Sequence, residues 1–295
     1  MDLLLYILAR ILFLIIMAVP LKVVARLGRI FGTIAYTFDK RHRRVAIKNL
    51  TMCFPEKTAE EIKRLAKENF KRIGENFLSA TKTMMMTKSE LVPHVEFVGV
   101  EKLENALRKS ENSSVVVAIG HFGNFELYAR FGEFSNGIKC ATTYRALNQK
   151  KLNNFVQNLR ERSGCLYFER RTDASKLQQT LRQGSVVLGL LADQHAGDKG
   201  LRLPFFGHDC STSAAPAVYA LRYKCPLFVA ICYRIDLAKW RIEINGPIST
   251  EENGKKRDVS EICSDINKLY EHAIRRDPAN WFWVHNRWKP PPKKT

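Results

Sequence analysis

The sequence predicts an α/β fold with a central mixed, mainly parallel sheet flanked by helices. Two apolar runs carry this prediction, residues 114–120 and 184–192, which are nearly continuous, rich in valine and leucine, and bounded by glycine or serine. Such runs are typical of strands that are buried on both faces of a parallel sheet. From Val95 onward they alternate with segments of helical periodicity, as in layered α/β proteins.

The elements follow in order along the chain. Residues 21–88 are predominantly helical, and Thr58 with Glu61 forms a capping box at the start of one helix. Strands are then predicted near 95–99, 115–119, 138–143, 165–168, 186–192, 227–234 and 240–245. Helices are predicted near 101–109, 125–134, 150–162, 173–183, 213–224 and 258–276. No internal repeat or flexible linker interrupts the 295 residues, so we expect one domain behind an N-terminal anchor.

The N-terminal segment predicts a transmembrane anchor over residues 1–25. Residues 3–19 are apolar except for Arg10, and continuation to residue 25 approaches the roughly 20 residues that cross a bilayer. The first charged residue is acidic, unlike that of a cleaved signal peptide. Basic residues gather after the apolar stretch, which places residues 26–295 on the cytoplasmic side. A helix that lies in the headgroup layer and a helix that is buried in the core are the alternatives.

Composition points to anionic partners and a reducing compartment. Lys and Arg total 48 against 29 Asp and Glu, a net charge of +19. Such an excess suits nucleic acid, anionic lipid, phosphorylated substrates or acidic proteins. The seven cysteines are scattered and odd in number, so we expect buried reduced thiols rather than disulfides. No metal-ligand motif is present, and a metal site is not expected.

His121 is the strongest candidate for chemistry, because it directly follows the run 114–120. In open α/β sheets, ligands bind at the carboxyl ends of the strands. Glu126 is close enough in sequence for its carboxylate to reach an imidazole nitrogen. A histidine held by a carboxylate suits a general base that removes a proton from a hydroxyl. No serine or cysteine nucleophile accompanies it, which favours direct transfer, and a purely structural histidine is the alternative.

Other polar residues follow neighbouring strands. Arg145 and Asn148 come after the third predicted strand, and Arg160 lies on the helix that follows. Arginine binds phosphate or carboxylate in two-pronged geometry, although a solvated helix face is the alternative for the basic residues of this helix. Asp193 ends the strand predicted near 186–192, where it could orient a catalytic side chain or clamp an arginine.

The loop and tail beyond this strand carry weaker signals. His195 is expected to be a satisfied polar neighbour rather than a second base. Phe205 and Phe206 could line a hydrocarbon pocket or simply pack in the core. Thr212 either caps the next helix or helps its amino terminus to receive a phosphate. The tail, residues 278–289, interleaves tryptophan with basic residues, which suits a membrane interface or single-stranded nucleic acid.

Taken in order, these motifs resemble those of the late, secondary acyltransferases of lipid A biosynthesis, the lauroyl and myristoyl transferase group. The resemblance covers nearly the whole chain. It rests on residues 43–50, 53–56, His121 with Glu126, Tyr144 and Arg145 with Asn148, 160–162, 193–195, 204–207 with Thr212, and 283–289. Family members commonly have proline where this chain has Ala146 and Gln149, a departure that concerns the acceptor more than the reaction.

The resemblance implies a fold similar to the glycerol-phosphate acyltransferase superfamily. It implies transfer of a fatty acyl group from acyl carrier protein, or acyl-CoA, to a hydroxyl of a lipid A precursor at the inner membrane, without a cofactor. His121 would be the base and Glu126 its orienting carboxylate. The expected substrate-binding residues are Arg145, Asn148, Arg160, Asp193, Phe205, Phe206 and Thr212.

The expected partners are therefore acyl carrier protein, the glycolipid and the membrane, and not nucleic acid. Two alternatives stay open. One is an acyltransferase for another membrane lipid, such as a phosphatidylinositol mannoside. The other is a non-enzymatic basic protein that binds membranes or nucleic acid through its +19 charge.

Overall fold

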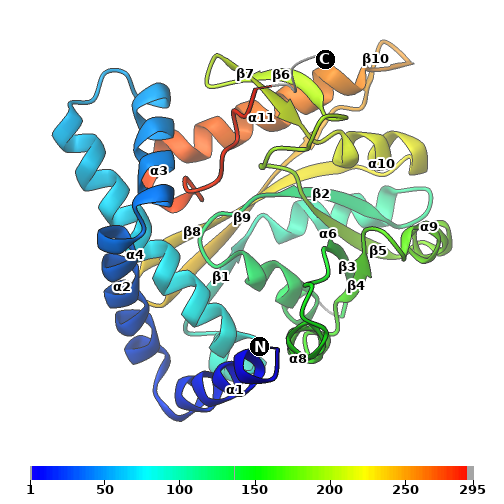
Figure 1. The fold of residues 1–295 in the computed structure, drawn as a ribbon. Helices are drawn as coiled ribbons and strands as arrows, with labels where there is room; N and C mark the ends of the chain where they lie inside the picture. Colours follow the sequence, from blue (N-terminus) through cyan, green and yellow to red (C-terminus); the bar gives the residue numbers. More distant parts are fainter. Residues whose placement is uncertain (1, 136, 291–295) are drawn as a thin grey trace.

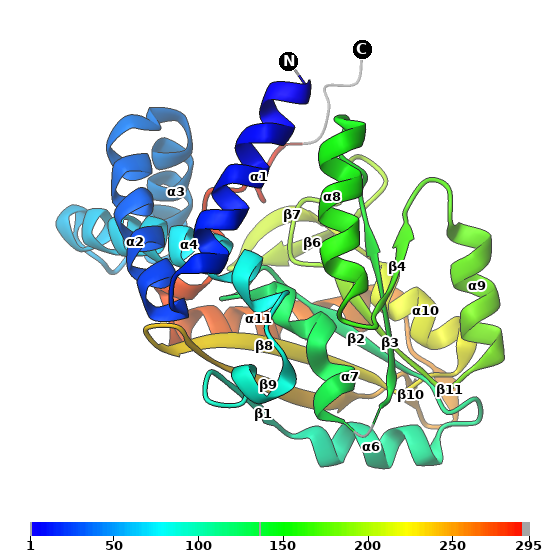
Figure 2. The ribbon, with the colours of Figure 1, turned by 90° about the horizontal axis from the view of Figure 1, so that it is seen from below.

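The computed structural model describes residues 2–135 and 137–290. A central twisted sheet lies between helices, and the N-terminal helices stand along one side of it (Figures 1 and 2). The sheet contains β1 (Val95–Val98), β2 (Val115–Ile119), β3 (Lys139–Tyr144), β4 (Leu166–Glu169), β5 (Val186–Leu191), β8 (Leu227–Asp236) and β9 (Lys239–Ile248). Its strand order is β1-β9-β8-β2-β5-β3-β4. Every neighbouring pair is parallel except β8 and β9, so the predicted mixed, mainly parallel sheet is confirmed.

Helices cover both faces of the sheet. One face packs against α6 (Val100–Lys109), the 3-10 helix η1 (Phe125–Arg130) and α7 (Phe131–Phe134), and the other against α9 (Ala174–Gln183), α10 (Ala215–Tyr223) and α11 (Val259–Arg276). The helix α8 (Lys150–Glu161) connects β3 to β4. The short elements are α5 (Lys88–Leu91), β10 (Glu251–Glu252), β11 (Lys255–Lys256) and η2 (Pro278–Asn280). All seven cysteines are buried and free, which confirms their prediction as small core residues.

A hairpin replaces the loop that the sequence suggested after β5. It consists of β6 (Leu201–Phe205) and β7 (His208–Thr212), which pair in antiparallel register. Phe206 and Gly207 form the turn, both with positive φ. The hairpin therefore carries the two phenylalanines and Thr212 into the core on the side of α11 (Figure 1).

Four helices form the N-terminal region: α1 (Asp2–Ala18), α2 (Leu21–Phe38), α3 (Lys40–Cys53) and α4 (Ala59–Thr83). The apolar segment is broken between α1 and α2, which run in different directions (Figure 1). Pro20 lacks an amide hydrogen and disfavours helical geometry in the residue before it, so the first helix ends at Ala18. Within the described residues, no helix combines the length and the apolarity that a membrane crossing requires. The structure therefore does not support the predicted transmembrane helix over residues 1–25.

Three glycines bring α2 and α4 into direct contact. A Cβ atom added to Gly28 would lie 2.5 Å from the carbonyl oxygen of Gly74, and one added to Gly32 would overlap the backbone at Phe70. The two helix backbones thus touch, with no side chain between them at these points. Small residues at such a crossing allow the closest approach that helices can make.

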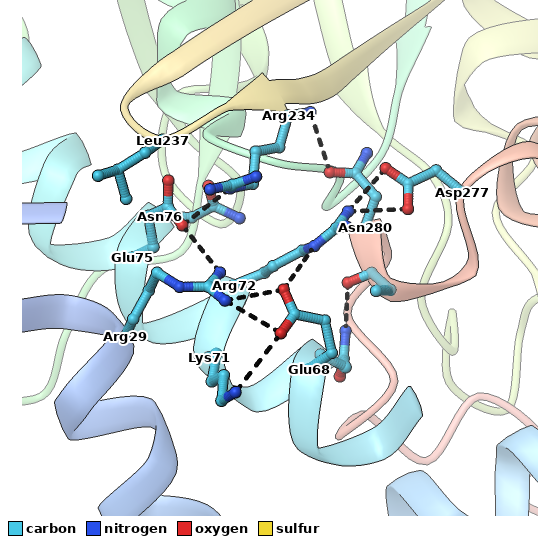
Figure 3. Close-up of polar contacts among 12 residues, drawn as sticks. Arg29, Glu68, Lys71, Arg72, Glu75, Asn76, Arg234, Leu237, Asp277 and Asn280 are labelled. Atoms are coloured by element: carbon cyan, nitrogen blue, oxygen red, sulfur yellow. Dashed lines mark hydrogen bonds and ion pairs between the residues drawn. The ribbon is translucent and has the colours of Figure 1, made fainter. Parts of the chain in front are cut away.

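Charged residues tie the same two helices to the rest of the fold (Figure 3). Glu75 of α4 is fully buried and accepts hydrogen bonds from Arg29 of α2 at 3.3 Å and from Arg234 of β8 at 2.8 Å. Arg72 donates to both carboxylate oxygens of Asp277, at 2.8 and 2.7 Å. Breaking one partner of such a buried pair is costly, so this network fixes the N-terminal helices to the sheet and to the C-terminal segment.

Candidate active site

His121 lies at the carboxyl end of β2, and the register of the sheet decides what lies beside it. Ile119 of β2 is opposite Leu191 of β5 in parallel register. Two residues further along each strand come His121 and Asp193. The imidazole Nδ1 lies 2.8 Å from Oδ1 of Asp193, and the His121 backbone N–H donates to Oδ2 at 2.8 Å. Adjacent strands thus bring together two residues that are 72 positions apart.

Asp193 is almost fully buried at this point, with 1% of its surface exposed. Burial alone would raise the pKa of the Asp193 carboxyl. The charge of His121, its two hydrogen bonds and a 2.8 Å hydrogen bond from Trp281 Nε1 instead hold that pKa below its ordinary value. The carboxylate is therefore ionised beneath the imidazole. A carboxylate bonded to Nδ1 fixes the proton there and leaves the Nε2 lone pair available.

Glu126 has a different partner from the one that its spacing suggested. Its carboxylate accepts two hydrogen bonds from Arg160 of α8, with Nη2 at 2.5 Å and Nε at 3.3 Å. Among the described residues, these are the hydrogen bonds of that carboxylate, and the imidazole is bonded to Asp193 instead. Glu126 lies in the first turn of η1, which directs it toward α8. The expectation that Glu126 orients His121 is thus corrected.

The Arg160 side chain lies at the edge of the site with its charge compensated. Desolvation would lower the pKa of its guanidinium, but the negative charge of Glu126 and the hydrogen bonds between the two groups raise it. The guanidinium carbon also lies 5.5 Å from the ring centre of Tyr167. Arg160 therefore remains a cation in the same cavity wall as His121.

A cavity of about 650 Å³ opens beside His121 and extends beneath η1 and α7. Its mouth is polar and includes His121, Glu126, Arg145 and Arg160. Its inner wall is apolar and comes from the strands and helices of one sheet face: Phe97, Leu103, Val117, Ile119, Phe131, Val187, Ala230, Ile242 and Ile244. A cavity that is apolar inside and polar at its mouth suits a ligand with a hydrocarbon part and a reactive polar end.

The structure places the remaining predicted residues unequally. Arg145 is exposed and lines the mouth of the cavity, whereas Asn148 is exposed further along the same loop and is not among the lining residues. Phe205 and Phe206 are buried on the opposite face of the sheet, in an aromatic cluster with Trp281 and Trp283. These two phenylalanines pack in the core and do not line the cavity.

Thr212 is also a core residue. It is buried, and its Oγ1 accepts a hydrogen bond from Arg287 Nη2 at 3.0 Å. Arg287 is itself fully buried and donates to the carbonyl oxygens of Gln194 and Ser211. Thr212 therefore anchors the C-terminal segment, a structural role, rather than presenting a helix terminus to a phosphate.

Two histidines of the cavity wall were not expected to be part of the site. His195 and His285 line the cavity, and the Nδ1 atom of each is buried without a hydrogen-bond partner among the described residues. Burial lowers the pKa of His285 to about 4, although the negative charge of Asp193 acts to raise it; the charge of Arg287 adds to the lowering. Burial and the charges of Lys289 and Arg287 also lower the pKa of His195. Both imidazoles are thus neutral near pH 7.

The C-terminal segment was interpreted from sequence as an interface tail, but it builds part of the site. Trp281 bonds Asp193, and the ring centres of Phe282 and His121 are 6.0 Å apart. The alternation of tryptophan with histidine and arginine in residues 281–289 was the available signal. Buried aromatic and cationic side chains in a terminal segment indicate docking into the core as readily as they indicate a membrane interface.

Comparison with known proteins gives the family that the chain is similar to. Residues 2–290 match the family model described as "Bacterial lipid A biosynthesis acyltransferase". The chain is 27% identical over 276 residues to the lipid A biosynthesis palmitoleoyltransferase of Escherichia coli K12, which covers 92% of this chain and 87% of the relative. It is 23% identical over 288 residues to the lauroyltransferase of the same organism, covering 95% and 89% of the two chains. The myristoyltransferase of that organism is 23% identical over 265 residues, 89% of this chain and 78% of the relative.

Proposed function

Because the chain belongs to the bacterial lipid A biosynthesis acyltransferase family, we propose that it moves a fatty acyl group from a carrier thioester to a hydroxyl of a lipid A precursor. The observation that carries the mechanism is the His121–Asp193 pair at the mouth of an apolar cavity. One group there can accept a proton, and the space beside it can hold a hydrocarbon chain. Direct transfer needs no more than these two features and a donor for the oxyanion.

His121 acts as the general base in this proposal. Asp193 holds the proton on Nδ1, so Nε2 accepts the proton of the acceptor hydroxyl as that oxygen attacks the thioester carbonyl. The tetrahedral intermediate then collapses, the C–S bond breaks, and the carrier thiolate takes up the proton from the imidazolium. General base assistance of this kind contributes roughly 10²–10⁴-fold. Asp193, in place of Glu126, stabilises the imidazolium that forms between the two steps.

The Glu126–Arg160 pair has a separate role at the same mouth. The guanidinium is held by a carboxylate on one side and by Tyr167 on the other, so it is positioned before substrate arrives. We infer that it contacts the anionic part of a substrate or the developing oxyanion. The neutral imidazole of His285 is another side chain of the cavity that can donate a hydrogen bond without adding charge.

The apolar cavity would hold the acyl chain of the donor. Its inner wall consists of the apolar side chains named above, and its polar mouth includes the proposed base, His121. Exposed cations follow β3 and β4. Arg145 and Arg170 line the cavity, Lys150 and Lys151 begin α8, and Arg171 follows Arg170. This arrangement suits an acidic carrier protein that delivers the thioester, and acyl-CoA phosphates would use the same cations.

We further propose that α1 and α2 seat the protein on the cytoplasmic leaflet of the inner membrane. Large apolar side chains of both helices are exposed: Leu3, Leu4, Leu5, Ile7, Leu8, Ile11, Leu12, Leu14 and Ile15 on α1, and Val23, Leu27, Ile30, Phe31, Ile34 and Phe38 on α2. Basic residues lie among and after them, including Arg26 and Lys40. Helices with one apolar and one basic side bind in the plane of an anionic interface.

The purified protein tests this function with acyl-carrier-protein donors of several chain lengths and a Kdo-containing lipid A precursor. We expect His121→Ala to lose at least roughly 10²-fold in transfer rate, because the base is gone, while flotation with vesicles that contain phosphatidylglycerol is unchanged. Mass spectrometry of the lipid product measures transfer.

Three outcomes would count against parts of the proposal. An active His121→Ala variant would show that His121 is not the base. Acylation of other membrane lipids but not of the lipid A precursor would show that the proposed acceptor is wrong. Wild-type protein that does not float with the vesicles would show that α1 and α2 do not bind the membrane.

A further inference from the structure

Trp281 donates a hydrogen bond to Asp193, the carboxylate that bonds His121. Its indole Nε1–H donates to Oδ2 of Asp193 at 2.8 Å, and the side chain is 1% exposed. The same oxygen accepts the His121 backbone N–H, while the other oxygen faces the imidazole. The buried carboxylate is thus held by three donors, one of which comes from the C-terminal segment.

The backbone on both sides of Trp281 is fixed by partners from distant parts of the chain. Asn69 of α4 donates to the carbonyl oxygens of Ala279 and Trp281, at 2.9 and 2.6 Å. Trp281 also forms an isolated bridge with Phe122, next to the base. Upstream, Asp277 is held by Arg72 (Figure 3). The indole therefore has little freedom to move away from the carboxylate.

We propose that Trp281 is a positioning residue for the proposed acyl transfer, acting through Asp193 to hold the His121 imidazole in its reactive orientation. This inference rests on the proposed function. The indole is not part of the lining of the 650 Å³ cavity, and it acts on the direction and the charge of the carboxylate. A carboxylate oxygen that accepts two hydrogen bonds, from the indole and from the His121 backbone, is held more firmly and attracts the imidazolium less strongly than one that accepts the backbone bond alone.

Loss of this donor has two consequences. The carboxylate can rotate, which misaligns the base, and its negative charge concentrates on the imidazole, which favours the protonated, inactive ring. Activity should then fall at a higher pH on the acid side of the profile. The other titratable and charged groups around the imidazole act equally on wild type and variant: Arg72 from α4, Glu126 from η1, Arg160 from α8, His195 after β5, and His285 and Arg287 from the C-terminal segment.

The experiment compares Trp281→Phe with Trp288→Phe in the full-length protein. Trp288 belongs to the same aromatic cluster, with its ring centre 6.1 Å from that of Trp281, but its Nε1 donates to the backbone oxygen of Phe205. Each substitution removes one indole N–H. We expect Trp281→Phe to lower kcat roughly 10- to 100-fold and to move the acid side of the pH–rate profile up by about 0.5–1 pH unit. Trp288→Phe should leave the profile in place.

A variant of the same shape controls for effects of altered packing. Benzothienylalanine at position 281 keeps the ring but replaces the N–H with sulfur, and it should reproduce both effects. Equal profiles for wild type and both position-281 variants, measured on protein with unchanged circular dichroism, would overturn the inference. Because His121→Ala is assayed beside them, an inactive wild type would instead overturn the proposed function itself.

Discussion

The two carboxylates near His121, Asp193 and Glu126, differ in their burial and in the side chains that they bond. Asp193 follows a buried strand, has almost no exposed surface and bonds the imidazole. Glu126 lies on a short 3-10 helix, is partly exposed and bonds a guanidinium. The register of β2 and β5 brings Asp193 to His121. The Glu126–Arg160 contact instead depends on two long side chains that extend toward each other from η1 and α8. The contrast teaches that a short sequence interval does not identify the partner of a catalytic histidine.

Replacement of the buried carboxylate should have the largest effect. In Asp193→Asn, an amide N–H₂ would replace one carboxylate oxygen and face the donors that now bond it, so the imidazole would lose its orientation and its counter-charge. We expect kcat to fall roughly 10³–10⁴-fold, as in other carboxylate–histidine pairs. Single-turnover transfer with a saturating acyl donor measures this step directly.

Glu126→Gln should have a smaller effect on rate. Arg160 would keep a neutral hydrogen-bond acceptor but lose its counter-charge at a site where both side chains are mostly buried. We expect about a tenfold loss in kcat/KM and about 1–3 kcal/mol less stability, with the acid side of the pH–rate profile unchanged. If Glu126→Gln were the inactive variant and Asp193→Asn the active one, the roles assigned to the two carboxylates would have to be exchanged.

The smallest expected effect is on how the free energy of unfolding depends on pH, through His285 near the buried Asp193. The pKa of His285 is lowered to about 4 from an ordinary value of 6.5, because its burial disfavours the charged ring. The unfolded chain therefore binds a proton between these values that the folded protein does not, and the free energy of unfolding falls as pH drops through this window. The lowered pKa of Asp193 adds a further loss below its ordinary value of 3.8.

His285→Gln should flatten this dependence. We expect the drop in Tm between pH 6.5 and pH 4 to be smaller by roughly 2 °C or more, measured by thermal unfolding. His195→Gln is the matched control, since that ring is more exposed and its substitution should change the slope less. An unchanged slope in His285→Gln would show that this ring titrates normally.

The sequence predicted the fold because the apolar runs of β2 and β5 are too continuous for anything but buried strands. It also proposed His121, Arg160 and Asp193 as residues of the site. The structure places His121 and Arg160 at one cavity and Asp193 against His121, and their functional roles stay predictions. What it lacked was strand order: that β5 adjoins β2 although β3 and β4 lie between them in the chain. The pairing of residues in the site depends on that order, so Glu126 was assigned the contact that Asp193 makes.

Two further differences have local causes. The average hydropathy of the first residues suggested one long span, but Pro20 divides the segment, and its effect is conformational rather than compositional. Phe205 and Phe206 look alike in a loop or in a hairpin, and only the pairing of β6 with β7 turns them into the core. The chemical character of these side chains was thus easier to predict than their position in the fold.

The glycine contact between α2 and α4 determines how the molecule can respond to its surroundings. With no side chains between the backbones at Gly28 and Gly74, neither helix can slide or roll without carrying the other. If α2 lies on a bilayer as proposed, a rotation of α2 would also rotate α4. Asn69 of α4 contacts the carbonyl oxygens of Ala279 and Trp281, so such a rotation would reach the segment that bonds Asp193.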